Sequence, residues 1–406
     1  MKFVSRAAVL VCLVLVSHLA GAQTLREKTL RDQALRAGLV AAEQLVPEFS
    51  KAKSEAGRLL FESTVLSLSR ETSCQTCHLD RFASADGLPL GIGTGGRGEG
   101  IERATTGGDI LPRNTLALWG RGSIGFETFF WDGKVDATSG RIVSQFGDEA
   151  PSNDPLVVAV HLPAVEIREM IPDNAAAELV RTETIDSAET IYREIESRVR
   201  ADPALSAALS EATGLPPPDV RFVHVADALA DFIRDRFRIK ATRFHKFIFA
   251  QGQLSENEIA GGLLFFGRGR CVACHMGPFF SDLSYHAIPF IQYGHGKNGF
   301  GVDYGRYNTT LDPYDLYKFR TPPLFNVTQT APYSHSGSIY DLSQAIRAHV
   351  DPLSQLQGFE LDYSERSEFY RRLGIWVREP AYGVELDNKD IETLVTFLKT
   401  LEFATE

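Results

Sequence analysis

The chain has 406 residues, of which 44% are hydrophobic and 23% are charged, values close to those of average globular domains. At roughly 150 residues per domain, this length predicts two or three packed units. The formal net charge is −10, and the sequence contains no block of Lys or Arg. This balance counts against a nucleic-acid partner, because a surface that meets phosphates is cationic.

The chain begins with the pattern of a secretory signal peptide, over residues 1–22. Lys2 and Arg6 form a positive end, and an apolar stretch runs from Ala8 to Val16. The small residues of Ala20–Ala22 form the cleavage pattern. The apolar stretch is far shorter than the ~20 residues that a transmembrane helix requires. We therefore expect export with cleavage near Ala22 and no membrane span in the mature chain.

Helical patterns followed by a cysteine motif come next in the chain. Apolar spacing predicts a helix over Leu25–Leu45, and a second helical pattern contains A-G-R-L-L-F at residues 56–61. A loop then leads to C-Q-T-C-H, which contains Cys74, Cys77 and His78. This motif is typical of haem c attachment, because each thiol forms a thioether with the haem and the His binds its iron.

The middle of the chain alternates helical patterns with long loops. Gly87–Arg113 and much of Gly294–Pro313 are rich in Gly and lack periodicity, and such long loops in a compact protein are usually functional. Apolar spacing predicts helices over Ala188–Val199 and Ala226–Phe237. The helix-breaking sequence G-L-P-P-P-D at Gly214–Asp219 marks the edge of a linker.

The second half repeats the helix and the cysteine motif. The sequence A-G-G-L-L-F at residues 260–265 matches the earlier A-G-R-L-L-F. It leads into C-V-A-C-H, which contains Cys271, Cys274 and His275. The same element before the same motif indicates an internal duplication. A last helical pattern covers Ile391–Phe403.

Disulfide bonds, a thioredoxin-like redox pair and a four-cysteine zinc site are the alternatives for these cysteines. Disulfides are common in exported proteins, but neither they nor a redox pair explains the His that follows each second Cys. A zinc site would require the pairs to meet across the stretch from His78 to Arg270, whereas zinc ribbons use short spacings. We therefore predict two covalently bound haem c groups in a mainly α protein, with long ordered loops and two cytochrome c-like haem domains, at residues 23–220 and 221–406.

Further motifs resemble those of the dihaem bacterial cytochrome c peroxidase family, which includes the MauG branch. They are F-W-D-G at residues 130–133, Glu169-Met170, F-R-T-P-P-L-F-N-V at 319–327 and T-A-P-Y at 330–333. The resemblance covers nearly the whole mature chain. It implies that hydrogen peroxide reacts at the N-terminal haem, that electrons pass through the C-terminal haem, and that the protein is periplasmic. Members of the family are often dimers, so a homodimer is an implied assembly.

The resemblance also places a Trp between the haems and a Glu over the open face of the first. These residues correspond to Trp131 and Glu169. An oxidisable indole would divide one long electron-transfer step into two, although Trp131 would also suit a packing role. Glu169 would carry a proton between the peroxide oxygens, and Glu166 is close enough in sequence to take that role instead. No His occurs between Leu79 and Val160, so the iron is expected to stay open opposite His78.

The second haem is expected to lack the Met ligand of the ordinary peroxidases in this family. Met276 directly follows His275, and Met170 belongs by resemblance to the first site. The G-R-M position of the family holds Gly305-Arg306-Tyr307 here. The resemblance therefore implies that Tyr307 binds the second iron, as in the MauG branch. Packing is the alternative role for Tyr307, because several other Tyr lie nearby in the sequence.

The resemblance assigns three further residues. His335 stands beside T-A-P-Y and is expected to hydrogen-bond a haem propionate. Asn114 and Pro289 resemble positions that hold a calcium ion between the domains, and oxygen ligands suit calcium.

The sequence thus predicts an exported dihaem oxidoreductase that reduces hydrogen peroxide and, like MauG, oxidises a protein substrate or an external donor at a distance. The near alternative is a cytochrome c peroxidase whose electron-donor protein is a small cytochrome or cupredoxin. An alternative of another class is a dihaem cytochrome that only carries electrons. That alternative requires two strong distal ligands, and the sequence offers no obvious pair.

Overall fold

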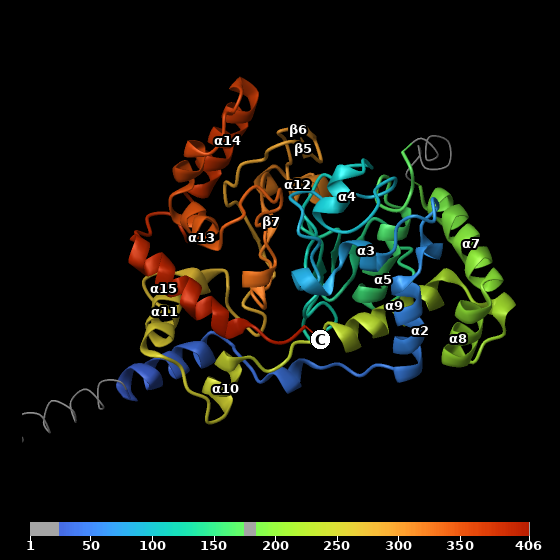
Figure 1. Ribbon diagram of the computed structural model, residues 1–406, viewed down its shortest axis with the longest axis horizontal. Helices are drawn as coiled ribbons and strands as arrows, with labels where there is room; N and C mark the ends of the chain where they lie inside the picture. Colours follow the sequence, from blue (N-terminus) through green and yellow to red (C-terminus); the bar gives the residue numbers. More distant parts are fainter. Residues whose placement is uncertain (1–23, 174–183, 406) are drawn as a thin grey trace, which may run out of the picture.

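The computed structural model describes residues 24–173 and 184–405, which form a mainly helical molecule with very short strands (Figure 1). The predicted fold class is therefore confirmed. The predicted signal peptide at residues 1–22 lies outside the described ranges. Within those ranges, no helix combines the length and the apolar character needed to cross a bilayer.

The N-terminal half is a group of helices around the first cysteine motif. Ser50 begins the helix that precedes the motif, because its side chain accepts a hydrogen bond from the Lys53 amide. The half contains η1 (Ala42–Leu45), α2 (Lys51–Glu62), α3 (Cys74–Cys77), α4 (Ile101–Thr105), α5 (Pro155–His161), α7 (Ile185–Ala201), α8 (Pro203–Thr213) and α9 (Phe222–Arg236). Because α9 packs against α2, the helices of this half run past the predicted boundary at residue 220. A helix over residues 24–36 precedes them in the chain.

The C-terminal half repeats this plan with its own helices around the second motif. Ser255 and Glu258 form a capping box at the start of the helix that carries the repeated sequence. The half contains α10 (Arg243–Phe249), α11 (Glu256–Phe266), the 3₁₀ turn η6 (Cys271–Ala273), α12 (Tyr307–Thr310), α13 (Leu342–Val350), α14 (Tyr363–Trp376) and α15 (Asn388–Leu398).

The strands are two residues long and fasten loops rather than build a core. They are β1 (Thr128–Phe129), β2 (Val135–Asp136), β3 (Val143–Ser144), β4 (Tyr285–His286), β5 (His295–Gly296), β6 (Gly299–Phe300) and β7 (Phe319–Arg320). All pairings are antiparallel: β1-β2-β3 form one sheet, β4 pairs with β7, and β5 pairs with β6. The turn between β1 and β2 carries Trp131, so this small sheet positions the indole between the halves.

The duplicated sequence has the same packing role in both halves. A Cβ atom at Gly57 of α2 would stand 2.0 Å from the Ala228 carbonyl oxygen of α9. A Cβ atom at Gly261 of α11 would stand 2.2 Å from the Thr393 carbonyl oxygen of α15. Glycine therefore allows the backbones of α2 and α9, and of α11 and α15, to approach closely. The predicted duplication is a repeated helix pair that supports each cysteine motif.

The halves are interlocked at both ends of the chain. The helix over residues 24–36 crosses to the C-terminal half (Figure 1), where the Arg31 guanidinium donates to the Ile248 carbonyl at 3.2 Å. At the other end, Phe403 packs edge-on against Trp119 with ring centroids 4.9 Å apart. The first helix ends well before Leu45, contrary to prediction, because Gly38 adopts φ +88° and redirects the chain.

Candidate functional site: two cavities that meet at Trp131

Both cysteine motifs hold their histidine in the same way. The His78 Nδ1 atom lies 2.8 Å from the Ser84 carbonyl oxygen, and the His275 Nδ1 atom lies 2.8 Å from the Phe280 carbonyl oxygen. Ser84 and Phe280 both adopt positive φ values, 66° and 51°, which turn the loop back over the imidazole. Donation from Nδ1 fixes the ring and leaves Nε2 for a metal.

The surroundings of each motif keep its side chains uncharged. Burial lowers the pKa of His78 and of His275 to about 4, so both rings are neutral at physiological pH, the form that binds a metal. Burial raises the pKa of Cys74 and of Cys271 to about 12. The four cysteines are unpaired, so no disulfide joins them.

The described part of the chain contains no cluster of four cysteines, which the alternative of a four-cysteine zinc site requires. The group there with suitable metal ligands consists of Cys274, Asp282 and His286, whose ligand atoms lie within 4.8 Å of one another. His286 is already held on both sides, by Asp282 at 2.9 Å and by Glu379 at 2.7 Å. The two cysteine pairs instead open into separate cavities.

The first cavity places two carboxylates near Cys74, Cys77 and His78. Both Glu166 and Glu169 line it, so the structure brings both predicted acid–base candidates to the motif. The Lys134 ammonium lies 2.7 Å from the Glu166 carboxylate. Burial would raise the pKa of Glu166, but the charges of Lys134 and Lys297 and the Lys134 hydrogen bond together outweigh burial, and the net pKa is lowered. Burial and the charge of Glu166 raise the pKa of Glu169 to about 7.

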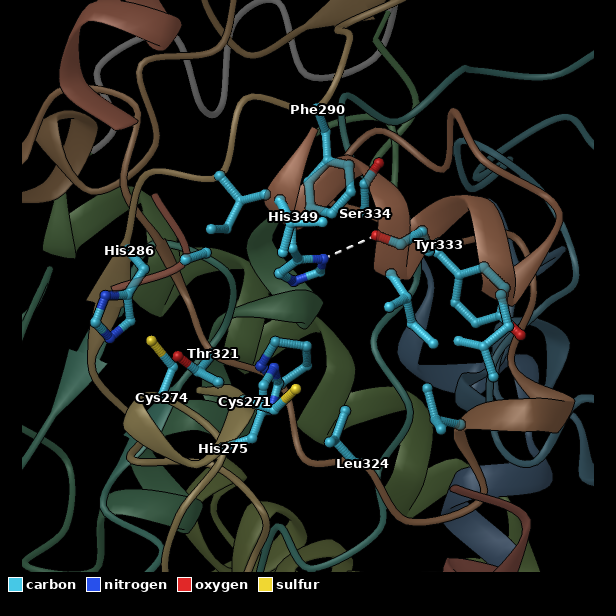
Figure 2. A pocket seen from close by; sticks show the side chains of 18 of the residues that line it. Cys271, Cys274, His275, His286, Phe290, Thr321, Leu324, Tyr333, Ser334 and His349 are labelled. Atoms are coloured by element: carbon cyan, nitrogen blue, oxygen red, sulfur yellow. Dashed lines mark hydrogen bonds between the residues drawn. The ribbon is translucent and has the colours of Figure 1, made fainter. Parts of the chain in front are cut away.

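The second cavity contains Cys271, Cys274 and His275 together with a histidine that the sequence did not single out (Figure 2). This residue, His349, comes from α13, and its ring faces His275 across the cavity. The two ring centroids are 6.4 Å apart.

His335, predicted to hydrogen-bond a haem propionate, lines the second cavity as well. Its ring stacks on Phe319 with centroids 3.6 Å apart and planes 10° apart. The His335 Nε2 atom is buried and has no hydrogen-bond partner among the described residues. This atom is therefore free to meet a polar group that enters the cavity.

Trp131 lines both cavities. Its indole Nε1 donates to the Asn114 carbonyl at 2.9 Å, and the Arg320 amide donates to the Trp131 carbonyl at 2.8 Å. Only 9% of the residue is exposed. The indole thus lies between the cavities of the two motifs, and its role as an electron relay stays a prediction.

Known proteins match this arrangement. The family model described as "Di-haem cytochrome c peroxidase" matches residues 51–255. The chain belongs to this family. It is accordingly a peroxidase-type oxidoreductase, and membership implies two haem groups, a peroxide substrate and an electron donor.

Relatives in this family cover most of the chain. Methylamine utilization protein MauG of Paracoccus denitrificans is 26% identical over 89% of this chain and 90% of its own length. MauG of Methylorubrum extorquens is 25% identical over 84% of this chain and 81% of its own length. The crystal structure of the diheme peroxidase BthA from Burkholderia thailandensis superposes with a TM-score of 0.64, covering 91% of this chain and 90% of BthA at 20% identity.

The cavities suit an anionic macrocycle such as haem. Arg121 lines the first cavity and Arg320 the second, and both are almost fully buried. Arg121 Nε and Nη2 and Arg320 Nη2 lack hydrogen-bond partners among the described residues. A buried cation without partners is costly, so these groups fit the carboxylates of a bound haem. Around them, the cavity walls are mostly apolar, as a porphyrin face requires.

Tyr307 does not come to the second cavity. It begins α12 and packs edge-on against Tyr304, with ring centroids 6.0 Å apart. It is not among the described residues that line either cavity. The structure therefore does not bring the predicted Tyr to His275.

The polar groups of Asn114 and Pro289 make hydrogen bonds to other residues of the protein. The Asn114 side chain donates to the Leu88 carbonyl at 2.8 Å, and the Pro289 carbonyl accepts from the Gln355 side chain at 3.1 Å. The calcium site at these residues stays a prediction.

Proposed function

We propose that this protein is an exported enzyme with two covalently attached haem c groups, which reduces hydrogen peroxide in the first cavity with electrons that arrive through the second. The observation that carries the proposal is that one indole, Trp131, lines both cavities. The bound haems would supply iron, which binds peroxide and exchanges electrons. The remaining chemistry falls to the side chains around them.

The residues that would hold the haems follow from the two motifs. Thioethers to Cys74 and Cys77, and to Cys271 and Cys274, would attach the macrocycles, while Nε2 of the adjacent histidine in each motif would bind iron. Attachment by thioethers fits thiols that are uncharged and unpaired. It also fits export, since haem c is attached outside the inner membrane in bacteria. The periplasm is the compartment that we propose.

Glu169 is the group that we assign to proton transfer. With its pKa raised to about 7, the Glu169 carboxyl is able both to accept and to donate a proton near neutral pH. Glu166 is held ionised by Lys134 and is poorly suited to exchange protons. We therefore assign Glu166 the supporting role of raising the pKa of Glu169.

The first cavity supports access for peroxide. Among the described residues that line it, His78 is the single histidine, so no second imidazole competes for the iron. The electron donor that we propose is an external protein. The MauG-like centre with Tyr307 as ligand is not part of the proposal, because that side chain lies outside the second cavity.

Replacement of Trp131 tests the proposal. The haem-loaded protein, matured in a cell that attaches haem c, is reduced with a small cytochrome and supplied with hydrogen peroxide. Wild-type protein should consume peroxide, and Trp131→Phe should slow turnover at least ten-fold while leaving the resting absorption spectrum unchanged. Trp119→Phe is the matched control, since Trp119 is buried but lines neither cavity. Peroxide consumption that is equally fast in Trp131→Phe would contradict the relay, and loaded wild-type protein that consumes no peroxide would contradict the function.

A further inference from the structure

We infer that His349, together with His275, would bind the iron of the haem held in the second cavity, so that this centre would have two histidine ligands and would be closed to peroxide. The inference deepens the proposed function, because it assigns the second cavity to electron transfer alone. It concerns a residue that no sequence motif marked. It also replaces the Tyr307 ligand that the sequence predicts.

The separation of the two rings is compatible with two imidazoles on one metal. A metal–imidazole bond is ~2 Å long, and the bonded nitrogen lies ~1 Å from its ring centre, so two collinear ligands place their ring centres ~6 Å apart. The centroids of His275 and His349 are 6.4 Å apart. Figure 2 shows these rings facing each other, with the sulfur atoms of Cys271 and Cys274 on either side of His275.

His349 is also oriented as metal-binding histidines are. Its Nδ1 atom lies 2.8 Å from the Ala345 carbonyl oxygen, one turn earlier in α13. This hydrogen bond leaves Nε2 as the free nitrogen, just as the carbonyls of Ser84 and Phe280 do for His78 and His275. Two neighbours fix the position of His349: Phe290 packs edge-on against its ring at 5.3 Å, and the Trp376 indole donates to its backbone carbonyl at 3.1 Å.

The two other histidines that line the second cavity, His286 and His335, do not pair with the His275 ring. His286 is held between Asp282 and Glu379. His335 lies flat against Phe319. Among the histidines that line this cavity in the described ranges, His349 is the one whose ring pairs with that of His275.

Two imidazole ligands would define how the second centre works. With two histidines on its iron, the centre would offer peroxide no binding position and would exchange electrons only. A Met ligand raises the potential of a haem, so the potential with two histidines should lie below that of a His/Met centre. Chemistry on peroxide is then confined to the first cavity, which has one histidine and the carboxylate pair.

Ligand-binding stoichiometry of the ferric, haem-loaded protein tests the inference without peroxide or donor. Wild-type protein should bind one cyanide per chain, at the first cavity, and should show the paramagnetic resonance signal of a low-spin centre with two histidines. His349→Gln should lose that signal and bind two cyanides per chain. His161→Gln is the matched control, because His161 is also helical and makes the same Nδ1 contact one turn back, 2.7 Å from the Val157 carbonyl, but lines neither cavity. It should behave as wild type.

Two further variants keep the test decisive. His349→Met retains a ligand and should restore a six-coordinate centre with a raised midpoint potential and a thioether-to-iron absorption band, even where the Gln variant folds poorly. Tyr307→Phe should leave both the signal and the stoichiometry unchanged. Loss of the low-spin signal in Tyr307→Phe, or its survival in His349→Gln, would overturn the inference. Neither outcome depends on peroxide turnover, so failure of the proposed function would be seen separately.

Discussion

Glu166 and Glu169 face the same cavity but differ in what surrounds their carboxyl groups. The Lys134 ammonium lies 2.7 Å from the Glu166 carboxylate and stabilises its ionised form. The ionised form of Glu169 is instead disfavoured by burial and by the negative charge of Glu166. Two carboxyl groups with separated pKa values are the usual way to obtain one proton carrier and one fixed charge. The sequence placed both residues near the site, but only the position of Lys134 distinguishes their roles.

This difference predicts the pH dependence of the peroxide reaction. The base form of Glu169 accepts the peroxide proton, so the second-order rate constant should rise with pH to a plateau, with a midpoint near the pKa of about 7. Glu169→Gln should lower the rate by ~10²–10⁴-fold and remove the midpoint, as expected for loss of a general acid–base group. Stopped-flow measurements between pH 5 and 9 would check this.

Glu166→Gln supplies the contrast for that experiment. It removes a neighbouring negative charge and frees Lys134, so the pKa of Glu169 should fall and the midpoint should move to lower pH while the plateau rate stays within a few-fold of wild type. A collapse of the plateau in Glu166→Gln, with Glu169→Gln unaffected, would reverse the two assignments.

At the scale of elements, the close helix pairs determine how firmly each motif is held. Gly57→Ala and Gly261→Ala each place a methyl group against a carbonyl oxygen of the partner helix, 2.0 Å and 2.2 Å away before relaxation. Overpacking of this kind costs ~1–3 kcal/mol. Both variants should lower the urea midpoint of unfolding of the haem-loaded protein. Each should also change the absorption spectrum of the haem in the half that carries the substitution.

Gly374→Ala is the control for these two variants. Gly374 is exposed in α14, and a Cβ atom there meets nothing within 4 Å. Alanine should stabilise this helix by up to ~1 kcal/mol, because it has the higher helix propensity. Equal destabilisation by all three substitutions would show that close helix approach is not what the repeated glycine provides.

The elements also show where sequence reasoning succeeds. The two C-x-x-C-H motifs and the repeated A-G-x-L-L-F segments are local signals, and the structure places each pair in equivalent surroundings. His349 has no such signal, because it is one of several histidines without a motif and its partner lies far away in the sequence. Tyr307 matched a local pattern, but the fold of the long loop carries it elsewhere.

At the scale of the whole molecule, one buried ion cluster joins the two halves beside the cavities. The Arg113 guanidinium of the first half lies 2.6 Å from the Asp132 carboxylate and 2.7 Å from the Asp303 carboxylate of the second half. Both aspartates have fully buried side chains. The cluster therefore holds the two halves in position relative to each other. Because Arg113 lines the first cavity and directly precedes Asn114, the cluster also positions the Asn114 carbonyl that accepts the hydrogen bond from Trp131.

Asp303→Asn therefore tests how the halves are held together. Burial would raise the pKa of Asp303, but Arg113 beside it outweighs burial and lowers that pKa below its unfolded value of ~3.9. The stabilisation is thus fully present above about pH 4 and is lost as the pH falls through the lower folded pKa. Removing the charge from a buried pair costs about 3 kcal/mol. Asp303→Asn should therefore lower the urea midpoint of unfolding at pH 7, and the difference between the midpoints of the variant and of wild type should become smaller in acid.

Asp148→Asn is the control for this variant. Asp148 and Arg141 are 3.9 Å apart with side chains 96% and 80% exposed, and such exposed ion pairs contribute little to stability. If both variants unfold like wild type at pH 7, the halves are held by packing and by the interlocked ends of the chain rather than by this cluster.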